Sequence, residues 1–276
     1  MGLRINTNIA SQEAQRNLRV NSSEQETEFA RLSSGKRITK SSDDAAGLAI
    51  SKKLEASTRG LKMATRNANN AISLVQVAEG GLNESTNILS RLRELSIQAA
   101  SDTVGEQERG YLNLEYQQLN QELDRIAVTT NFNGMPLLKG EGKTMEFHVG
   151  AFGGEENKIS FDAGATDATA ENLGIRGTDI TNKGGAAKNL EKIDKAIDQV
   201  SGYRANLGSI QSRLGSTISN LEIATVNQDA ARSRIEDTDI AESSSKLASI
   251  NIMKAAGTSV LAQAKDLPAN ALRLLG

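Results

Sequence analysis

The sequence predicts a mainly α-helical fold, an elongated antiparallel helical bundle or coiled coil that carries one small β-hairpin. Only two prolines occur in 276 residues, which leaves two very long stretches free of helix breakers. Aromatic residues make up 3 % of the chain and tryptophan is absent, which fits a thin assembly of small and aliphatic residues better than a compact globule. Apolar residues also recur every seven positions, which is typical of long helices packed together.

The first long helix is predicted to run from about residue 45 to residue 101. Ser41 and Asp44 have the spacing of a capping box at its start. Small residues dominate the positions three after each heptad residue and allow close helix approach, while Leu95 helps to widen the apolar face. Gly80 and Gly81 cost about 2 kcal/mol relative to two alanines and predict a local bend. The heptad positions are Leu54, Leu61, Ala68, Val75, Leu82 and Leu89.

A shorter second helix is predicted after a turn at residues 102–105, and it should run back along the first. Thr103 and Glu106 repeat the capping-box spacing. The apolar residues that follow are separated by alternating steps of four and three, as in an amphipathic helix. They are Leu112, Tyr116, Leu119, Leu123 and Ile126.

Between about residues 130 and 185 the pattern changes from helix to strand and loop. Asn133, Gly134 and Pro136 are typical of turns. Residues 145–149 and 158–162 alternate apolar and polar side chains around a glycine-rich turn, which predicts a small β-hairpin. The polar, glycine-rich stretch that follows, to residue 185, is expected to be a loop.

A third long helix is predicted where apolar residues return to helical spacing, from Leu190 to Thr225 and more weakly on to Ile235. Arg204 and Gln211 interrupt this apolar face, and such residues cost stability but fix the register between helices. Two long helices and a shorter one, joined by short turns, bury their apolar faces only as a rod-like bundle.

The two ends of the chain are amphipathic, but their apolar stripes are too weak to hold an isolated helix. Residues 1–40 carry seven basic and four acidic groups, and residues 240–276 carry four and two, so charge does not draw the ends together. We interpret both ends as loosely ordered alone and folded when buried against neighbouring subunits. The residues expected to mediate this assembly are Ile5, Ile9, Leu18, Phe29, Leu32, Ile240, Leu247, Ile250, Val260, Leu261, Leu272 and Leu275.

Composition excludes several other classes of protein. Cysteine is absent and His148 is the one histidine, so disulfides, thiolate sites and multi-histidine metal centres are excluded. A net charge of −2 argues against nucleic-acid binding, and no apolar stretch is long enough to span a membrane. The acidic residues 236, 237 and 239 could bind a cation, but capping of the final helix is the favoured interpretation. We expect no enzyme activity, no cofactor and no bound metal.

Several sequence motifs resemble those of bacterial flagellin, the filament subunit of the flagellum. They are RLSSGKRI at residues 31–38, SDDAAGLAI at 42–50 and AGTSVLAQA at 256–264. The resemblance covers nearly the whole chain in family order. Only about fifty residues separate the predicted second and third helices, so the chain resembles a minimal flagellin without large central insertions.

The resemblance implies that the chain polymerises head-to-tail into an open helical filament for swimming motility. It implies an inner filament-core domain made of helices at 1–42 and 237–276, and an outer-core domain made of 43–186 and 187–236. It also implies an extracellular location reached through the flagellar type III export channel. No cleavable signal is visible in the sequence, which agrees with such export. Implied partners are further copies of the chain, an export chaperone, the cap protein and the hook-junction proteins.

Two further expectations follow from the resemblance. Arg91, Leu95 and Glu115 match positions that contact the flagellin-sensing Toll-like receptor, although Ser90 departs from the glutamine often found before them. Ordinary helix-surface and subunit contacts are the other interpretation of these three residues. The alternative function is that of a hook–filament junction protein, a family in which proline usually follows an acidic pair. Here Ala45 follows Asp43 and Asp44.

Overall fold

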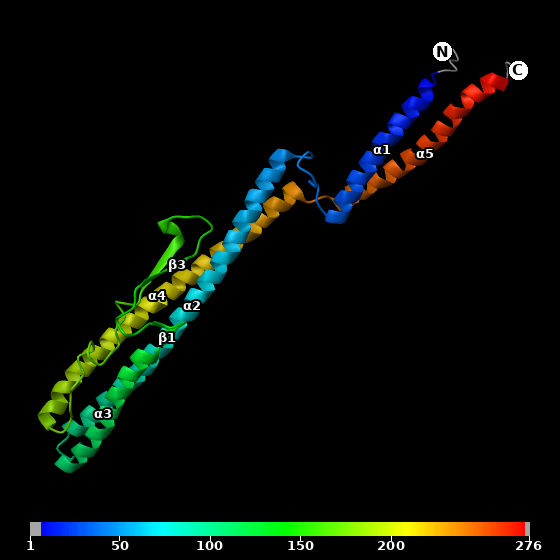
Figure 1. Ribbon diagram of the computed structural model, residues 1–276. Coiled ribbons are helices and arrows are strands. Elements are labelled where there is room, and N and C mark those ends of the chain that lie inside the picture. The colour runs from blue at the N-terminus through cyan, green and yellow to red at the C-terminus, as the bar shows by residue number, and fades with distance from the viewer. Residues whose placement is uncertain (1–6, 274–276) are drawn as a thin grey trace. The chain divides into compact units, whose positions relative to one another are not determined.

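The computed structural model describes residues 7–273, with side chains described as far as residue 266. Within that range the chain forms helices and a small amount of antiparallel β-structure, which confirms the predicted mainly α-helical class (Figure 1). The chain divides into two units, one of residues 1–56 and 227–276 and one of residues 57–226. The helices are α1 (Ile9–Ser34), α2 (Ala45–Ala100), α3 (Glu106–Thr129), α4 (Lys183–Glu236) and α5 (Ile240–Arg273).

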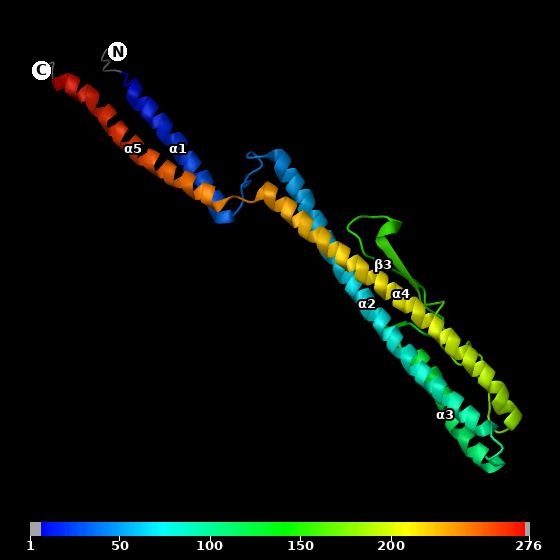
Figure 2. The same ribbon diagram turned by 180° about the vertical axis from the view of Figure 1, so that it is seen from behind.

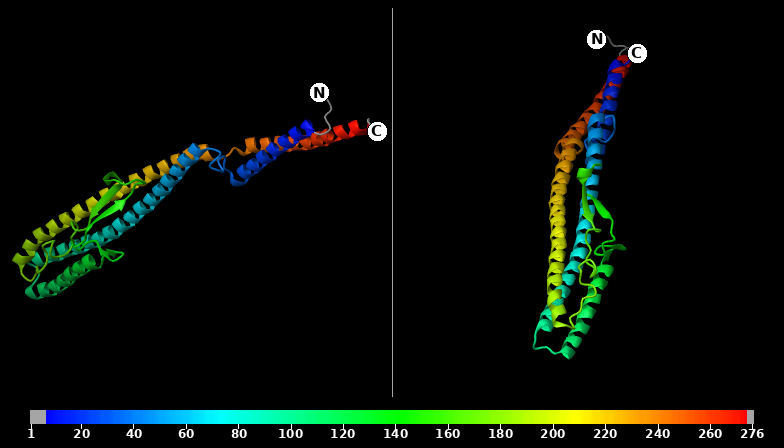
Figure 3. Two further views of the ribbon diagram at one scale, coloured as in Figure 1. Left: turned by 45° about the horizontal axis from the view of Figure 1, so that its top comes forward. Right: turned by 90° about the vertical axis from the view of Figure 1, so that its left-hand side faces the viewer.

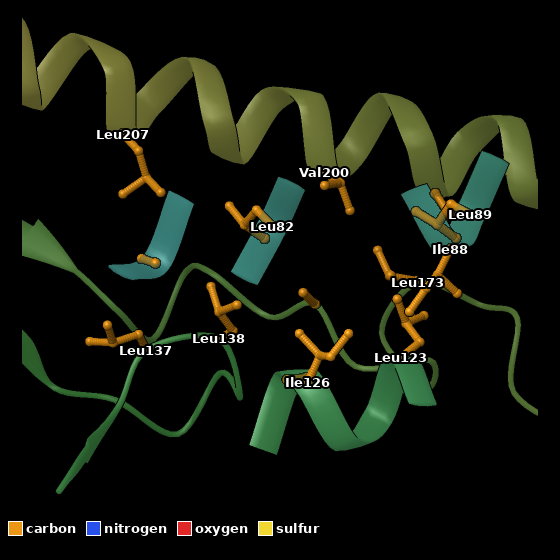
Figure 4. Packing of buried hydrophobic residues seen from close by; sticks show 14 of the residues in the cluster. Leu82, Ile88, Leu89, Leu123, Ile126, Leu137, Leu138, Leu173, Val200 and Leu207 are labelled. Atoms are coloured by element: carbon orange, nitrogen blue, oxygen red, sulfur yellow. The ribbon is translucent and has the colours of Figure 1, made fainter. Parts of the chain in front are cut away.

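The core of the second unit includes residues of α2 and α4, which run in opposite directions (Figure 2). The predicted heptad positions of α2 are buried from Leu61 to Leu89, and those three residues later are buried from Ala64 to Leu92. Helix α4 supplies a matching row of buried residues seven apart. Figure 4 shows side chains of α2 and α4 together with Leu123 and Ile126 of α3 in one cluster. The α4 row is Ile193, Val200, Leu207, Leu214 and Leu221.

The helix starts differ from the predicted capping boxes. Oδ1 of Asp44 accepts the backbone N–H of Gly47 at 2.8 Å, so Asp44 itself caps α2 and Ser41 does not. The neighbouring Asp43 bonds back to the N–H groups of residues 39 and 40. Helix α3 begins after Gly105 with no side-chain cap bond, so the prediction for Thr103 is also wrong. A spacing of three residues does not by itself make a capping box, because the backbone must also place the first side chain at the N-cap.

Helix α2 is continuous through Gly80 and Gly81, where a bend was predicted. A Cβ atom at Gly81 would lie 2.7 Å from both Leu138 Cδ1 and Thr130 Oγ1, whereas Gly80 faces open space. Close packing of the segment after α3 against α2 therefore explains the glycine at position 81.

Strands β3 (Thr144–His148) and β4 (Lys158–Asp162) form the predicted antiparallel hairpin, with Met145 opposite Phe161. A second hairpin, whose strands have two residues each, was not predicted. Its strands are β1 (Asn131–Phe132) and β2 (Met135–Pro136). Its turn has positive φ at Asn133 (52°) and Gly134 (79°), the conformation that Asn-Gly favours in tight hairpins. The Asn-Gly pair in the sequence could have predicted this second hairpin.

Residues 163–182 contain no helix or strand, as predicted, but they are packed against the bundle. Leu173, Ile175 and Ile180 are buried in the main hydrophobic cluster. Polar side chains of α3 hold the segment: the hydroxyl of Tyr116 lies 2.8 Å from Thr178 Oγ1, and Asn120 Nδ2 donates to Ile175 O at 3.2 Å. The segment therefore closes the open side of the bundle core.

Candidate assembly surface

Helices α1 and α5 form an antiparallel pair. Asn8 Nδ2, just before α1, donates to Ala264 O at 2.6 Å, while Gln25 Nε2 donates to Asn251 Oδ1 at 2.6 Å near the other end of the pair. Figure 3 shows the two helices side by side in both of its views. Lys254 Nζ also donates to Gln25 Oε1 at 2.8 Å, so polar bonds help to fix the register.

The ends of both helices are specified locally by the sequence. Asn8 Oδ1 accepts the N–H of Ser11 at 3.0 Å and caps α1, which ends at Gly35 in the left-handed conformation (φ 69°). Asp239 Oδ1 accepts the N–H of Ala241 at 2.8 Å and caps α5, as predicted for the acidic cluster. Glu236 of that cluster has a different role, described below.

The hydrophobic core of the α1/α5 pair is thin. Ala14, Ile250 and Ala264 are its buried apolar side chains among the described residues. The helices approach closely at Gly257, where a Cβ atom would lie 3.0 Å from Leu18 Cδ2. The remaining predicted assembly residues that are half-buried in the pair are Leu18, Leu32, Leu247 and Leu261.

Other predicted assembly residues lie on the surface of the pair. The exposed fractions are 59 % for Ile9, 53 % for Phe29, 64 % for Ile240 and 54 % for Val260. Ile5 and Leu275 lie outside the described residues, and the side chain of Leu272 lies outside the described side chains. Half-buried and exposed members of the predicted set thus occupy different faces of the same helices.

Three exposed apolar residues of the pair were absent from the predicted set. They are Val20, Ile252 and Met253, of which Ile252 is 70 % exposed. The sequence could have predicted this exposed surface from Ile250, Ile252 and Met253. Apolar residues so close together on a helix cannot all face one partner helix. A helix with apolar residues on more than one face is buried on more than one side.

A groove of about 440 Å³ lies along the pair and is lined by residues of both helices. Glu28 lines it and is 5 % exposed. Its Oε1 pairs with Arg31 Nη1 at 2.8 Å, whereas its Oε2 is buried without a hydrogen-bond partner. The groove therefore contains a carboxylate that the isolated chain satisfies only in part.

The segments that connect the pair to α2 and α4 are joined by a polar cluster. Lys36 Nζ forms an ion pair with the buried carboxylate of Glu236, and Ser51 Oγ donates to the same carboxylate. The two connecting segments also pair through their backbones, where Thr238 N donates to Gly35 O at 3.0 Å. The Lys36 ammonium, followed by the Ser51 hydroxyl, lowers the pKa of Glu236 below its ordinary value.

The residues expected to contact an immune receptor lie on α2 and α3. Arg91 Nε donates to Glu115 Oε1 at 2.9 Å, and both side chains are about half exposed. Leu95 is only 1 % exposed and belongs to the bundle core. The expectation for Leu95 therefore needs correction, because its side chain is not available at the surface of the folded chain.

Among the described residues, no group of three or more histidine, cysteine, aspartate and glutamate side chains is placed to hold a metal ion. Nor does any described helix have the length and apolarity to cross a membrane. Several large apolar side chains of the helix pair are exposed, and exposed apolar surface of this kind marks a site of protein–protein contact.

Comparison with known proteins identifies the family. The bacterial flagellin N-terminal helical region matches residues 5–143, and the bacterial flagellin C-terminal helical region matches residues 190–275. The chain is 42 % identical to a flagellin of Halalkalibacterium halodurans over 271 residues, covering 98 % of this chain and 99 % of that one. The chain belongs to the bacterial flagellin family. It is a structural subunit of the flagellar filament that polymerises with itself, and it is not an enzyme.

Other relatives show which features vary. Flagellin D of Vibrio cholerae is 34 % identical over an alignment of 377 positions that covers both chains fully, so it carries segments that this 276-residue chain lacks. The crystal structure of Bacillus cereus flagellin matches with a TM-score of 0.51 at 30 % identity, covering 56 % of this chain and 88 % of that one. A putative flagellar hook-associated protein from Vibrio parahaemolyticus matches with a TM-score of 0.59 over 71 % of this chain and all of that one. Its 15 % identity shows a shared fold alone.

Proposed function

We propose that the α1/α5 pair is the polymerisation element of this flagellin. The observation that carries the proposal is the set of exposed apolar side chains on a pair that has almost no core of its own. Packing against the pairs of neighbouring subunits would bury them. A head-to-tail contact whose rotation does not close produces an open helical filament. The exposed members are Ile9, Val20, Phe29, Ile240, Ile252, Met253 and Val260.

The balance of free energies accounts for subunits that stay soluble before assembly. Apolar burial contributes about 25 cal/mol per Å², whereas ordering the backbone costs roughly 1–2 kcal/mol per residue. With so few buried apolar side chains, the isolated pair gains little against this cost. Growth at a preformed filament end supplies the missing burial, so subunits add there and not to one another in dilute solution.

The domain organisation belongs to the same proposal. Residues 1–42 and 237–276 form the inner filament-core domain, and residues 43–186 and 187–236 form the outer-core domain. The division of the chain into units with boundaries near residues 56 and 227 supports this organisation, although it places the first turns of α2 and the last turns of α4 with the helix pair.

Seeded elongation tests the proposal directly. Ile252→Asn should block addition of purified subunits to sonicated filament seeds, whereas the apolar control Ile252→Leu should elongate normally. Val260→Thr keeps the side-chain shape and should slow elongation. Circular dichroism must show that each variant retains the folded bundle. Normal elongation by Ile252→Asn and Val260→Thr would contradict the proposal.

The alternative function, a hook–filament junction protein, is separated by the same assay. A filament subunit adds to seeds until monomer is exhausted, whereas a junction protein adds a few copies and stops. The 42 % identity to a flagellin over nearly the whole chain supports the filament role. Electron microscopy of filament length against subunit concentration distinguishes the two outcomes.

We also propose export through the flagellar type III channel without cleavage of a signal, followed by assembly outside the cell. Membership of the flagellin family supports this route. An export chaperone, the filament cap and the hook-junction proteins are the partners that such a route requires. Mass spectrometry of subunits from isolated filaments should show an uncleaved N-terminus, and a shortened one would contradict the proposal.

Recognition of released subunits by the Toll-like receptor for flagellin is a second proposal. The favouring observation is that Arg91 and Glu115 are exposed and joined across α2 and α3, which presents both charges on one surface. Arg91→Ala should lower receptor signalling by soluble monomer, while the exposed cation Arg125, which pairs with Glu122 on its own helix, provides a control. Equal signalling by Arg91→Ala and Arg125→Ala would exclude a specific role for Arg91.

A further inference from the structure

The groove along the α1/α5 pair contains an acidic group that the chain does not satisfy. Glu28 is only 5 % exposed, yet only one of its two carboxylate oxygens has a hydrogen-bond partner. The other, Oε2, is buried without a donor. A buried charged oxygen without a hydrogen bond raises the free energy of the isolated pair, so the site is complete only when a donor is supplied.

The cations of α1 and α5 nearest to this groove already have partners. Lys246 lines the groove, but its Nζ lies 3.6 Å from Glu242 Oε1 on its own helix. Lys254 Nζ donates to Gln25. Arg31 already bonds Oε1 of Glu28, and its Nε donates to Arg37 O at 3.1 Å. None of these three cations donates to Oε2 in the folded chain, which leaves that oxygen open to a donor from a neighbouring molecule.

We propose that Glu28 accepts a charged hydrogen bond from a cationic side chain of a second copy of this chain, seated in the groove. The inference rests on the proposed function, because polymerisation through the pair is what brings a second copy to this surface. The groove lining is mostly polar and includes a second acidic residue, Glu24, while Ile250 and Met253 are its apolar members. A cationic side chain seated there would therefore meet two carboxylates and a small apolar patch.

Charge complementarity favours a second copy as the occupant. Arg16 and Arg19 on α1 and Lys265 on α5 are exposed and make no hydrogen bond or ion pair with other described side chains. Each copy thus brings unpaired cations to a surface where each copy also presents an unsatisfied carboxylate. The contact repeats along a polymer without any partner of another kind.

Glu28→Gln separates this inference from an ordinary structural role. In the monomer it removes a charge that is only half satisfied, so hydrogen-exchange protection of α1 should stay the same or rise. In the filament it removes the charged acceptor, so the critical concentration for seeded elongation should rise about tenfold. Glu26→Gln, an exposed acid of the same helix, is the matched control and should change neither quantity. Loss of protection in the Glu28→Gln monomer, or an unchanged critical concentration, would overturn the inference.

Charge reversal identifies the donor. Glu28→Lys should block elongation, and one of Arg16→Glu, Arg19→Glu or Lys265→Glu in the same chain should restore it. Restoration by Lys246→Glu alone, or by none of these, would overturn the inference. If Glu28→Gln elongates normally while Ile252→Asn does not, this inference fails and the proposed polymerisation role stands.

Discussion

The bundle of α2, α3 and α4 and the pair of α1 and α5 are both built from antiparallel helices, yet they bury their apolar residues differently. In the bundle, rows of leucine, isoleucine and alanine seven residues apart are fully buried in one cluster. In the pair, three apolar side chains are buried among the described residues, while several large ones are exposed. Helical periodicity alone therefore does not distinguish a self-sufficient core from a surface that neighbouring subunits complete.

The largest expected effect is in the bundle core. Leu82→Ala removes a fully buried side chain and should lower the free energy of unfolding by about 2–5 kcal/mol. Leu247→Ala in the pair removes a half-buried side chain and should cost much less. Chemical denaturation followed by circular dichroism measures both. Equal losses would show that the pair is as well packed as the bundle.

Smaller changes in stability, of opposite sign, are expected when two adjacent glycines of α2 are replaced by alanine. Gly81→Ala should destabilise the bundle by about 1–3 kcal/mol, because the new methyl meets Leu138 and Thr130. Gly80→Ala faces open space and should stabilise the helix by roughly 0.5–1 kcal/mol. Thermal unfolding of the two variants should therefore shift in opposite directions. A shared direction would contradict the packing described at Gly81.

The stability of the connecting segments should fall in acid. Because the pKa of Glu236 is lowered in the folded chain, its contribution to stability is present above its ordinary value of 4.5 and is lost as the pH falls through the lower folded value. Glu236→Gln should remove this part of the pH dependence. Limited proteolysis at residues 35–44 between pH 6 and pH 3 reports the difference. An identical acid response in the variant would exclude Glu236 as the responsible group.

The smallest effect is expected for exposed ion pairs of the bundle. Arg93 Nε donates to Asp194 Oδ1 at 2.7 Å between α2 and α4, but both side chains are about half exposed. Water and salt screen such a pair, so Arg93→Gln should leave the denaturation midpoint unchanged within error. A clear shift would show that charge, and not only the heptad rows, fixes the register of the bundle.

Much of the fold could be predicted because its signals are repetitive. The heptad rows of α2 and α4 and the alternation in β3 and β4 each repeat over many residues, so single exceptions do not obscure them. Leu95 is instructive: its spacing placed it on the apolar face of α2, while the family resemblance placed it at a receptor contact. The structure agrees with the spacing.

The features that could not be predicted depend on contacts between distant segments. The close approach of Leu138 to Gly81, the buried residues of the loop after β4 and the exposure of Ile252 are set by which surfaces meet in space. One sequence shows that a residue is apolar, but not which of two surfaces covers it. The assembly residues divided into half-buried and exposed groups for this reason.

The separation of α1 and α5 along the chain has a consequence for quality control. Asn8 and Ala264 are bonded across 256 positions of sequence, so the pair can form only when both ends of the chain are present and have come together. A truncated chain lacks α5, and a chain whose middle part does not fold cannot pair α1 with α5. Addition to the filament would then select for complete, folded subunits. Defective copies would be excluded from the filament without a separate quality-control protein.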